Sequence, residues 1–460
     1  MHDESTFRSM IAQDLEDAVM AGIQYAKTLG AYGAEAYLSV SRSRRAKSQN
    51  GTLEDLTRSK RGGLGVRVLR QGTNGICVGS ATTSDITRRD VTELFRQAWE
   101  LSALGDEDPW IRQASPEGTD DLPSRFDARA EALTPKDRIN RALMLEESAR
   151  NASSKICAVR NSTWADGSGA SLLLTDKGVR TPNIASTCSA SIELAAEWNN
   201  DRQAAYHWDI GRHPESVDIE SIGREAAKKA ETKLNPQQLP AGKYAVVLHP
   251  EVTVDLLGII TSMLSAESVL RGRSLFADKL GQIIASPSLT LTDDGQMPDG
   301  LGSEPWDGEG IPTKRNILIQ DGILVTYLHN LRTAAEMDTT ATANASRSTT
   351  GNPGITTFNL FPKVGSKTPE TIIAQLQNGV MITEIMGLHT INPVSGDMSV
   401  GASGIRIRNG SLEESVDRMT FAGNLRDLML NIVEVGSDLR WYGSSAGLTI
   451  LLEEMTLGGG

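Results

Sequence analysis

The chain has 460 residues, of which 39% are apolar and 23% are charged. This length predicts two to four domains, each large enough to bury a core, and the composition excludes wholesale disorder and a fibrous architecture. Acidic residues outnumber basic ones by 58 to 46, which gives a net charge of −12. A field of this sign disfavours a nucleic-acid partner unless a local basic face overrides it.

The densest run of basic residues is the segment Ser41–Lys47, Ser-Arg-Ser-Arg-Arg-Ala-Lys. It lies in a strand-like stretch and carries no interleaved aromatic residues. We interpret it as a solvated strand edge, because charged side chains commonly protect exposed edges from pairing. We therefore expect no nucleic-acid partner.

The three cysteines, Cys77, Cys157 and Cys188, are an odd number without CxxC or Cys/His spacing. This usage argues against a disulfide framework or a structural zinc and favours a reducing compartment. The N-terminus lacks the basic start and unbroken apolar core of a secretory signal, and the longest apolar stretch, Val254–Leu264, is too short for a membrane helix. We expect a cytoplasmic protein without a membrane partner.

The first half of the sequence mixes helical and strand-like patterns. Apolar residues recur every three or four positions from Phe7 to Ala26 and predict one long helix that ends at Gly30. The expected strands are 34–40, 64–68, 156–160, 171–175 and 187–198, and the expected helices are 84–101, 219–230 and one with Thr134 as cap and Pro135 at its first position. Residues 105–133, rich in Asp, Pro, Ser and Arg, are expected to form a surface connection.

The second half is predicted to be mainly β. Short apolar strands flank Asp321-Gly322 and Asn409-Gly410, two dipeptides typical of tight hairpins. Helices are expected near 252–264, 369–377 and 424–433. The segment 235–241 separates the halves, so we predict an α+β protein. Residues 1–235 form an N-terminal α/β domain, with helices packed on an antiparallel sheet, and residues 236–460 form a C-terminal, mainly β, barrel-like domain.

One segment of the second half, 339–352, contains almost only Thr, Ala, Asn, Ser and Gly. Such side chains offer little apolar surface, so the segment is not expected to anchor a core. We predict a mobile loop there.

The densest polar cluster of the sequence is the segment 387–399, which contains His389, Asn392, Ser395 and Asp397. A nucleophile–base arrangement is one interpretation, but the residues share one short loop and no strained elbow of the GxSxG type is present. Asn-Pro and Ser-Gly-Asp are turn-forming sequences, in which Asx side chains bond the backbone. We favour a turn or a cradle for a peptide backbone and take the four residues as tentative peptide contacts.

Other site chemistries find less support. Among the six histidines only His207 and His213 lie near each other, and no pair has the helical spacing of a zinc site. The glycine-rich stretch Arg61–Gly65 precedes a strand, whereas phosphate cradles precede a helix. The acidic stretch Glu304–Gly310 is interpreted as a solvated turn. We expect no metal or cofactor in this chain.

Several ordered signatures resemble the TldD/PmbA family. The first half contains Gly30-Ala-Tyr-Gly-Ala-Glu35 and Gly63-Leu-Gly-Val-Arg-Val68, and the second half contains the stretches 239–248, 307–313, 389–397 and 422–425. The second set resembles the PmbA branch, also called TldE. The resemblance spans nearly the whole chain and implies the two-domain organisation that the patterns predict independently.

The resemblance also implies a function. The TldD branch carries a HExxxH helix and is the zinc peptidase, whereas the TldE branch pairs with it and lacks these ligands. Here the stretch Pro250–Gly258, where a zinc helix would be expected, contains no histidine. The resemblance therefore implies the non-catalytic subunit of a cytoplasmic heterodimeric metallopeptidase, which shapes a chamber and presents extended or unfolded peptide to zinc in its partner, in proteolysis or peptide maturation.

Two alternatives stay open at this stage. One is an autonomous hydrolase that uses the His389–Asp397 loop, and the other is a non-enzymatic modulator of DNA gyrase, a role historically attached to the family. The isolated chain is not expected to be an enzyme by itself, and both a monomer and a homodimer are compatible with its sequence.

Overall fold

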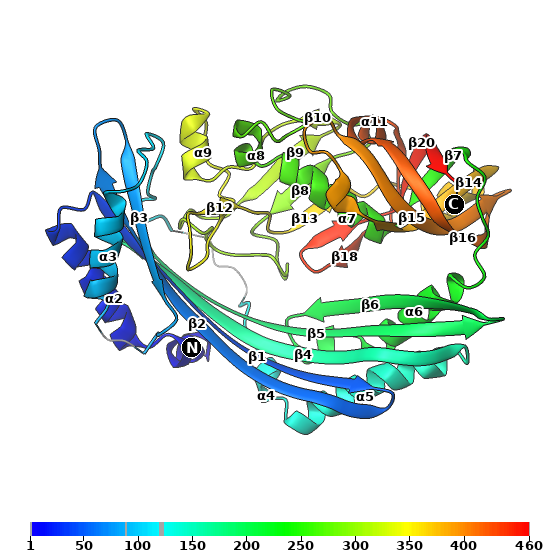
Figure 1. Ribbon diagram of the computed structural model, residues 1–460, viewed down its shortest axis with the longest axis horizontal. Helices are drawn as coiled ribbons and strands as arrows, with labels where there is room; N and C mark the ends of the chain where they lie inside the picture. Colours follow the sequence, from blue (N-terminus) through cyan, green and yellow to red (C-terminus); the bar gives the residue numbers. More distant parts are fainter. Residues whose placement is uncertain (1, 88–89, 119–123, 460) are drawn as a thin grey trace.

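The structure is a computed structural model that describes residues 2–87, 90–118 and 124–459 (Figure 1). Its first half contains a sheet with the strand order β3-β2-β1-β4-β5-β6, in which every neighbouring pair is antiparallel. The strands are β1 (Gly33–Gln49), β2 (Thr52–Gln71), β3 (Ile76–Thr83), β4 (Ile156–Thr175), β5 (Arg180–Trp198) and β6 (Asp201–Gly211). Strands of this length extend along the molecule as a curved ribbon.

Helices cover one face of this sheet in two groups. They are α1 (His2–Met10), α2 (Gln13–Thr28), α3 (Thr92–Ser102), α4 (Ala128–Ala132), α5 (Pro135–Ala152) and α6 (Ile219–Thr232), with a 3-10 turn at Pro214–Ser216. The first three pack with the start of β1 and the end of β2 in one apolar core, and α5 and α6 share a second core with β4, β5 and β6. The opposite, concave face of the sheet is turned toward the second half (Figure 1).

The helices and strands predicted for this half are present and differ in extent, whereas β6 and the short helix α4, inside the expected connection 105–133, were not predicted. The single N-terminal helix is two helices with a break after Met10, although its predicted apolar stripe is buried. The helix expected from Ser84 begins at Thr92, and the two strands expected at 156–160 and 171–175 are one strand, β4. Thr134 caps α5 with Pro135 at the first position, as predicted, and it also forms a capping box with Asp137. Residues 88–89 and 119–123 of the expected helix and connection lie outside the described residues.

A closed barrel forms the core of the second half. Its strands are β7 (Gly242–Leu248), β14 (Asn378–Met386), β15 (Asp397–Arg408), β16 (Ser411–Asn424) and β20 (Ile450–Gly458), and pairing of β16 with β20 closes it. The strand β17 (Ile432–Val435) extends the sheet beside β20. The helices α7 (Pro250–Met263), α10 (Pro369–Ala374) and α11 (Leu425–Leu430) agree with the three expected helical regions. The predicted α+β class and barrel-like second half are confirmed.

A second sheet packs beside the barrel, with the order β10-β9-β8-β13-β19-β18. Its strands are β8 (Leu291–Asp294), β9 (Arg315–Gln320), β10 (Ile323–Leu324), β13 (Leu360–Pro362), β18 (Arg440–Tyr442) and β19 (Ser445–Gly447). The remaining elements are α8 (Ala266–Leu270), α9 (Leu331–Glu336), a small β11–β12 pair (Ala345–Ser346 and Gly354–Ile355) and a 3-10 turn at Leu388–Thr390. Both predicted hairpins form, with positive φ at Asp321-Gly322 and Asn409-Gly410.

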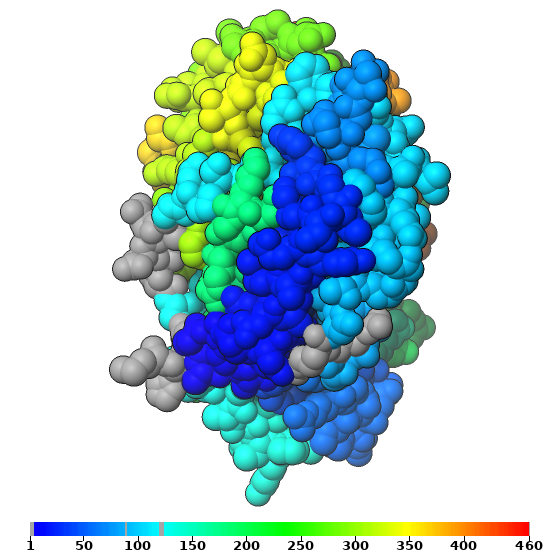
Figure 2. All heavy atoms as spheres, turned by 90° about the vertical axis from the view of Figure 1, so that its left-hand side faces the viewer, coloured from blue at the N-terminus to red at the C-terminus, as the bar shows by residue number. Residues whose placement is uncertain are grey.

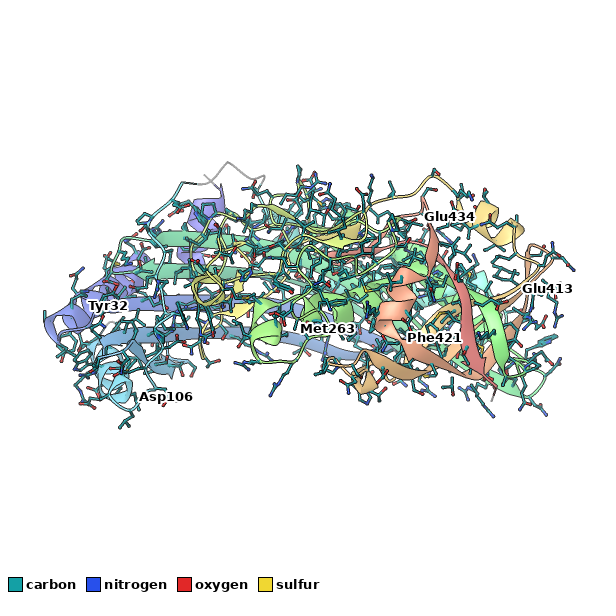
Figure 3. The ribbon with its side chains drawn as sticks, turned by 90° about the horizontal axis from the view of Figure 1, so that it is seen from above. Tyr32, Asp106, Met263, Glu413, Phe421 and Glu434 are labelled. Atoms are coloured by element: carbon teal, nitrogen blue, oxygen red, sulfur yellow. The ribbon has the colours of Figure 1, made fainter. Side chains whose placement is uncertain are left out.

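The two halves lie against each other along the molecule. Figure 2 shows the end that carries α1 and α2, in dark blue, with the yellow-green part of the second half above them. Seen from above, Tyr32 and Asp106 lie at this end, and Glu413 and Glu434 lie at the barrel end (Figure 3). In the ranges that the structure describes, no helix combines the length and apolar character needed to cross a membrane. We keep the division at 235/236 as a proposal for the domain boundary.

Candidate functional site between the two halves

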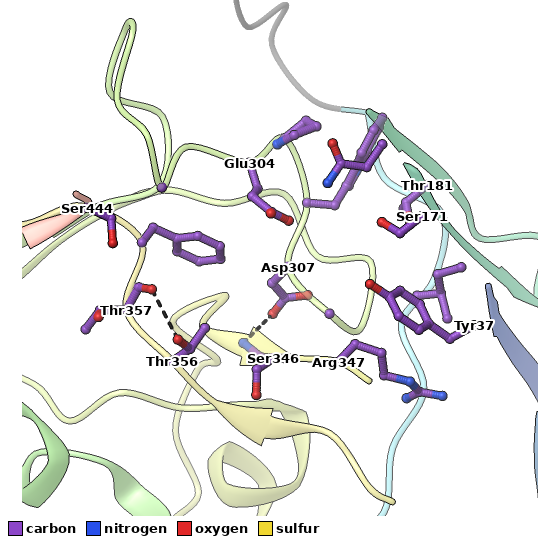
Figure 4. Close-up of a pocket in the computed structure, with 18 residues that line it drawn as sticks. Tyr37, Ser171, Thr181, Glu304, Asp307, Ser346, Arg347, Thr356, Thr357 and Ser444 are labelled. Atoms are coloured by element: carbon purple, nitrogen blue, oxygen red, sulfur yellow. Dashed lines mark hydrogen bonds between the residues drawn. The ribbon is translucent and has the colours of Figure 1, made fainter. Parts of the chain in front are cut away.

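A cavity of about 300 Å³ lies where the concave sheet meets the second half (Figure 4). The sheet contributes Tyr37 from β1, Ser171 from β4 and Thr181 from β5. The second half contributes loops, chiefly the acidic stretch 304–308, the segment 345–347 and residues 356–358. The lining is mixed in chemistry, with hydroxyl groups, two carboxylates and an arginine beside aromatic rings.

A buried ion-pair cluster joins the halves next to this cavity. Glu35 on β1 accepts a hydrogen bond from Arg67, its cross-strand neighbour on β2, and another from Arg347 Nη2 at 2.7 Å. Burial acts to raise the pKa of Glu35, but the two guanidinium groups outweigh it and hold that pKa at about 2. The cluster therefore keeps a carboxylate ionised inside the contact between the halves.

Two further carboxylates in the cluster behave in the opposite way. Asp307 Oδ1 accepts hydrogen bonds from the amides of Glu309 at 2.9 Å and Ile311 at 3.0 Å, and Oδ2 accepts one from Ala345 at 3.0 Å. Glu309 Oε2 accepts one from Leu331 N at 2.8 Å. Burial raises the pKa of both groups, and the Asp307 charge raises that of Glu309 further. The interpretation of 304–310 as a solvated turn is wrong for these two residues, because the turn is covered by the other half.

The segment 339–352 also differs from its prediction. Thr342, Ala343, Asn344 and Ala345 are buried, and Asn344 Nδ2 donates to Asp293 Oδ2 at 2.7 Å. The expectation that nothing in this segment anchors a core is therefore wrong. Apolar content was a poor guide because hydrogen bonds and an ion pair, rather than bulky side chains, hold this segment in place.

The glycine-rich stretch at 61–65 explains how this segment reaches the sheet. A Cβ at Gly65 would overlap the backbone carbonyl of Thr349, and a Cβ at Gly63 would lie 3.3 Å from the Thr349 side chain. The missing side chains on β2 allow the segment to lie directly on the strand, which places Arg347 beside Glu35. The close approach of two backbones, rather than a phosphate, accounts for Gly65, and the Thr349 side chain lies against Gly63.

The helix after β7 tests whether the chain could hold zinc. Reading the HExxxH pattern from His249 puts Pro250 and Val254 where a glutamate and the second histidine are needed. His249 instead caps α7, accepting a hydrogen bond from Glu251 N at 3.3 Å. The backbone of Gly447 on β19 packs onto this part of α7, with a Cβ position that would be 2.8 Å from Val254 Cγ2. The residues present do not fit a HExxxH zinc site.

The rest of the described ranges offers no alternative set of metal donors. No group of three or more His, Cys, Asp or Glu side chains there is arranged to hold a metal ion. His207 and His213, the one close pair in sequence, lie on β6 and before the turn at 214–216, and they engage different partners. Structural and catalytic zinc sites use three or four converging donors, so no step of any reaction is assigned to a metal here.

The four residues expected to contact peptide lie together outside the cavity, three in the loop between β14 and β15 and Asp397 at the first position of β15. Asn392 Oδ1 accepts hydrogen bonds from the amides of Val394 at 2.9 Å and Ser395 at 3.2 Å, which is turn chemistry. Ser395 Oγ donates to Asp397 Oδ2 at 2.7 Å, and Asn424 Nδ2 donates to Asp397 Oδ1 at 3.1 Å. These two bonds lower the pKa of Asp397.

His389 is exposed in this loop, and the Ser395 hydroxyl donates to Asp397 rather than to His389. The geometry therefore gives no support to a nucleophile–base pair of these two residues. Sequence reasoning missed Asn424, which ties the loop to the start of α11. It lies in the stretch 422–425 that carries part of the family resemblance. Its position before a predicted helix could have marked it as a capping residue.

Comparison with known proteins agrees with this architecture. Three domain profiles match the chain: PmbA/TldA metallopeptidase domain 1 over residues 34–102, the central domain over 129–234, and the C-terminal domain over 241–459. Together they span most of the sequence. The chain belongs to the PmbA/TldD metallopeptidase family.

Individual relatives place it in the PmbA branch of that family. The metalloprotease PmbA of Escherichia coli O157:H7 is 27% identical over 97% of this chain and 96% of its own length. A crystal structure from Thermotoga maritima, named for a proposed role as a modulator of DNA gyrase, is 25% identical, with a TM-score of 0.88 over 96% of this chain and all of that one. TldE from Thermococcus kodakarensis, at 19% identity and a TM-score of 0.84, shares the fold.

Three of the stretches that carry the family resemblance meet at the site between the halves. Glu35 ends the first, Gly65 and Arg67 lie in the second, and Asp307 and Glu309 lie in the third. The sequence alone does not show that these stretches meet, because Glu35 and its partner Arg347 in the other half are 312 positions apart. In this PmbA-branch protein these stretches therefore lie at the contact between the halves, which Arg347 completes from outside them.

Proposed function

We propose that this chain is the subunit of a heteromeric metallopeptidase that does not hold the metal. The observation that carries the proposal is the α7 helix, in which Pro250 and Val254 stand where a HExxxH site needs its glutamate and its second histidine, and Gly447 packs on the same turn. Membership of a metallopeptidase family together with an unsuitable donor set favours a complex in which metal binding and peptide presentation belong to different subunits. The zinc would then lie in a TldD-like partner.

In this proposal the subunit encloses part of a chamber and presents extended or unfolded peptide to the partner's zinc. The exposed loop with His389, Asn392, Ser395 and Asp397 is our candidate for contact with the peptide backbone. Its side chains hold a rigid turn, and its exposure leaves it open to a partner or substrate. The proposed setting is the cytoplasm, in proteolysis or peptide maturation.

A role as a modulator of DNA gyrase is the second candidate, since the Thermotoga maritima relative and another from Bacteroides thetaiotaomicron are named for it. The net charge of −12 disfavours direct contact with DNA. A modulator that acted through proteolysis of a gyrase-directed protein would remain consistent with the first proposal.

Co-expression with a HExxxH-bearing paralogue from the same cell tests the proposal. We expect the two chains to purify together, zinc to bind to the paralogue, and an unstructured peptide to be cleaved in a chelator-sensitive way only by the pair. The matched control is the same pair with the first histidine of the paralogue's HExxxH replaced by alanine, which should assemble but not cleave. One zinc per isolated chain that survives dialysis and is lost in His207, His213 or His249 variants would overturn the proposal.

A further inference from the structure

The outer half of strand β2 has a free edge. On one side β2 pairs with β1 from Thr52 to Leu69, but on the other side β3 pairs only with Leu64–Gln71. Within the described ranges, no strand or backbone hydrogen bond occupies that side of Thr52–Gly63. In Figure 1 this part of β2 runs along the lower rim of the sheet. Its outward amide and carbonyl groups are therefore available to another chain.

This free edge is long and open on both faces. Most residues of Thr52–Arg61 are exposed, whereas the next residues of β2 are covered by the Thr349 segment and by Ile86, which lies against Gly62. At about 3.3 Å per residue, ten residues of strand span about 33 Å. That length accommodates an extended peptide of similar size without any rearrangement of the sheet.

The charges on the edge are unbalanced at one end. Register places Arg42 directly opposite Lys60 and Arg44 opposite Arg58, so two like-charged pairs follow each other on one face. Such pairs oppose strand pairing unless an anion neutralises them. The acidic residues of the same strand do not neutralise them, because Glu54 pairs with Lys47 and Asp55 pairs with Arg45.

Of the side chains in these two pairs, the cations on β1 have hydrogen-bond or ion-pair partners elsewhere among the described residues, whereas those on β2 do not. Arg42 donates to the Ser9 carbonyl, and Arg44 lies 3.6 Å from Asp166 and 3.9 Å from Glu131. Arg58, Lys60 and Arg61 form no ion pair with the residues that the structure describes. An excess of positive charge therefore remains on the free edge of a chain whose net charge is −12.

We propose that the Thr52–Arg61 edge of β2 binds an extended, acidic polypeptide segment as an added strand. Unpaired amides and carbonyls supply the backbone hydrogen bonds, and Arg58, Lys60 and Arg61 select carboxylates at the positions beside them. The same cations repel a second copy of this edge, which disfavours self-pairing. A nucleic acid would satisfy the charges but not the backbone groups, so the unpaired edge favours a peptide.

This inference rests on the proposed function only in naming the class of peptide that the subunit would present. Binding itself needs this chain alone and no zinc partner. Failure of the edge to bind peptide would therefore leave co-purification and chelator-sensitive cleavage untouched, and failure of those two would leave the edge measurement untouched.

The test is fluorescence anisotropy with labelled peptides as long as the edge, titrated with the full chain. We expect a peptide that alternates glutamate with β-branched residues to bind. The same peptide with lysine in place of glutamate should bind with an affinity lower by on the order of tenfold or more. A peptide with the same charge but with proline in place of the β-branched residues should bind on the order of tenfold more weakly, because it lacks those amide donors.

The variant pair is Arg58→Glu with Lys60→Glu, which should weaken binding of the acidic peptide on the order of tenfold or more. The matched control is Arg224→Glu with Lys228→Glu, an equal change of charge at exposed positions of α6, which packs on β5 and β6 at the other edge of the sheet. The control should bind like the unmodified chain. Unchanged melting temperatures for both variants would show that folding is intact.

Three results would overturn the proposal. Equal binding of the proline peptide would reduce the site to a charge effect without strand addition. Unchanged affinity in the Arg58→Glu, Lys60→Glu variant would place the peptide elsewhere. Displacement of the acidic peptide by a single-stranded oligonucleotide of similar length, with greater affinity and the same dependence on Arg58 and Lys60, would identify the edge as a nucleic-acid surface.

Discussion

Glu35 shows how a single side chain couples two halves of the chain. Its carboxylate is buried between Arg67, which comes from the same sheet, and Arg347, which comes from the other half. Removing one partner from a buried ion pair is costly because the remaining charge loses both its solvation and its counter-ion. Glu35 thus holds the side chains of both Arg67 and Arg347 in place, and this gives the contact between the halves a defined geometry.

The loop between β14 and β15 allows the peptide-cradle and hydrolase interpretations to be separated at single residues. Asn392→Ala removes the acceptor for two backbone amides, Val394 N and Ser395 N, and we expect a loss of stability of about 0.5 to 2 kcal/mol, as for a lost helix cap. Asp397→Ala should also loosen the loop, because it removes the acceptor for Ser395 Oγ and Asn424 Nδ2. Both variants should slow peptide cleavage by the reconstituted complex.

Ser395→Ala is the matched comparison in that experiment. It removes one hydroxyl from an exposed site and leaves the Asn424 bond to Asp397 intact, so cleavage and melting temperature should stay close to those of the unmodified complex. Cleavage and thermal unfolding are measured on the same three variants. Loss of a chelator-resistant peptidase activity of the single chain in Ser395→Ala, at an unchanged melting temperature, would instead establish a nucleophile.

Strand β2 illustrates how an element can be specialised along its length. Its inner part carries Gly63 and Gly65, on which the 345–350 segment lies, and its outer part is a free edge. Gly65→Ala would place a methyl group against the Thr349 backbone, and we expect a destabilisation of about 1 to 3 kcal/mol, as for other overpacked contacts. The segment should also become more accessible to limited proteolysis, since the shift must occur in one of the two backbones.

Gly258→Ala is the control for this change. Gly258 lies in α7 with open space around its Cβ position, so alanine should raise helix stability by a few tenths to about 1 kcal/mol. Cleavage of the free chain should occur, if at all, at the exposed tip formed by Ser348, Thr350, Gly351 and Asn352. Cleavage of the unmodified chain within the buried residues 342–345 would contradict the structure.

The sequence could predict those elements that local patterns determine. Thr134 followed by Pro135 marked the start of α5, and the Asn409-Gly410 dipeptide marked a hairpin, because caps and tight turns depend on residues close in the chain. The long strand β4 was predicted as two short strands because its central stretch, 161–170, is polar and rich in small residues. Its burial comes from flanking strands rather than from its own composition.

The site between the halves was beyond local reasoning. Glu309 follows an Asp-Gly pair and reads as a surface turn, whereas in the folded chain burial and then the charge of Asp307 raise its pKa. Arg347 sits among small polar residues, and its partner Glu35 is 312 positions away. The family resemblance grouped the stretches without showing their contact, so it could indicate that they matter but not that they meet.

At the scale of the whole molecule, a second contact joins the halves at β6, and it contains a neutral histidine. His207 is buried, with Lys229 Nζ of α6 at 3.2 Å from Nδ1 and Arg440 Nη2 of β18 at 3.2 Å from Nε2. Lys229 also pairs with Glu251 of α7 at 2.5 Å. Burial, followed by the charges of Lys229 and Arg440, lowers the pKa of His207 to about 4. Protonation there would place a third cation between two others.

This arrangement predicts a pH dependence of known sign. The pKa of His207 is lower in the folded chain than its ordinary value near 6.5, so the unfolded chain binds the proton more readily. The stability that the neutral imidazole provides is fully present above pH 6.5 and is lost as the pH falls toward 4. His207→Gln keeps an uncharged side chain with a donor and an acceptor and cannot take up the proton. The free energy of unfolding of the unmodified chain should therefore fall more steeply than that of the variant below pH 6.5, and the difference should be constant above it.

Denaturant unfolding at a series of pH values measures the slopes, and an NMR titration of His207 measures its pKa directly. Arg440→Gln should raise that pKa by removing one of the two facing charges. Equal slopes for both chains, or a folded-state pKa near 6.5, would show that the second contact between the halves does not enclose His207 as described.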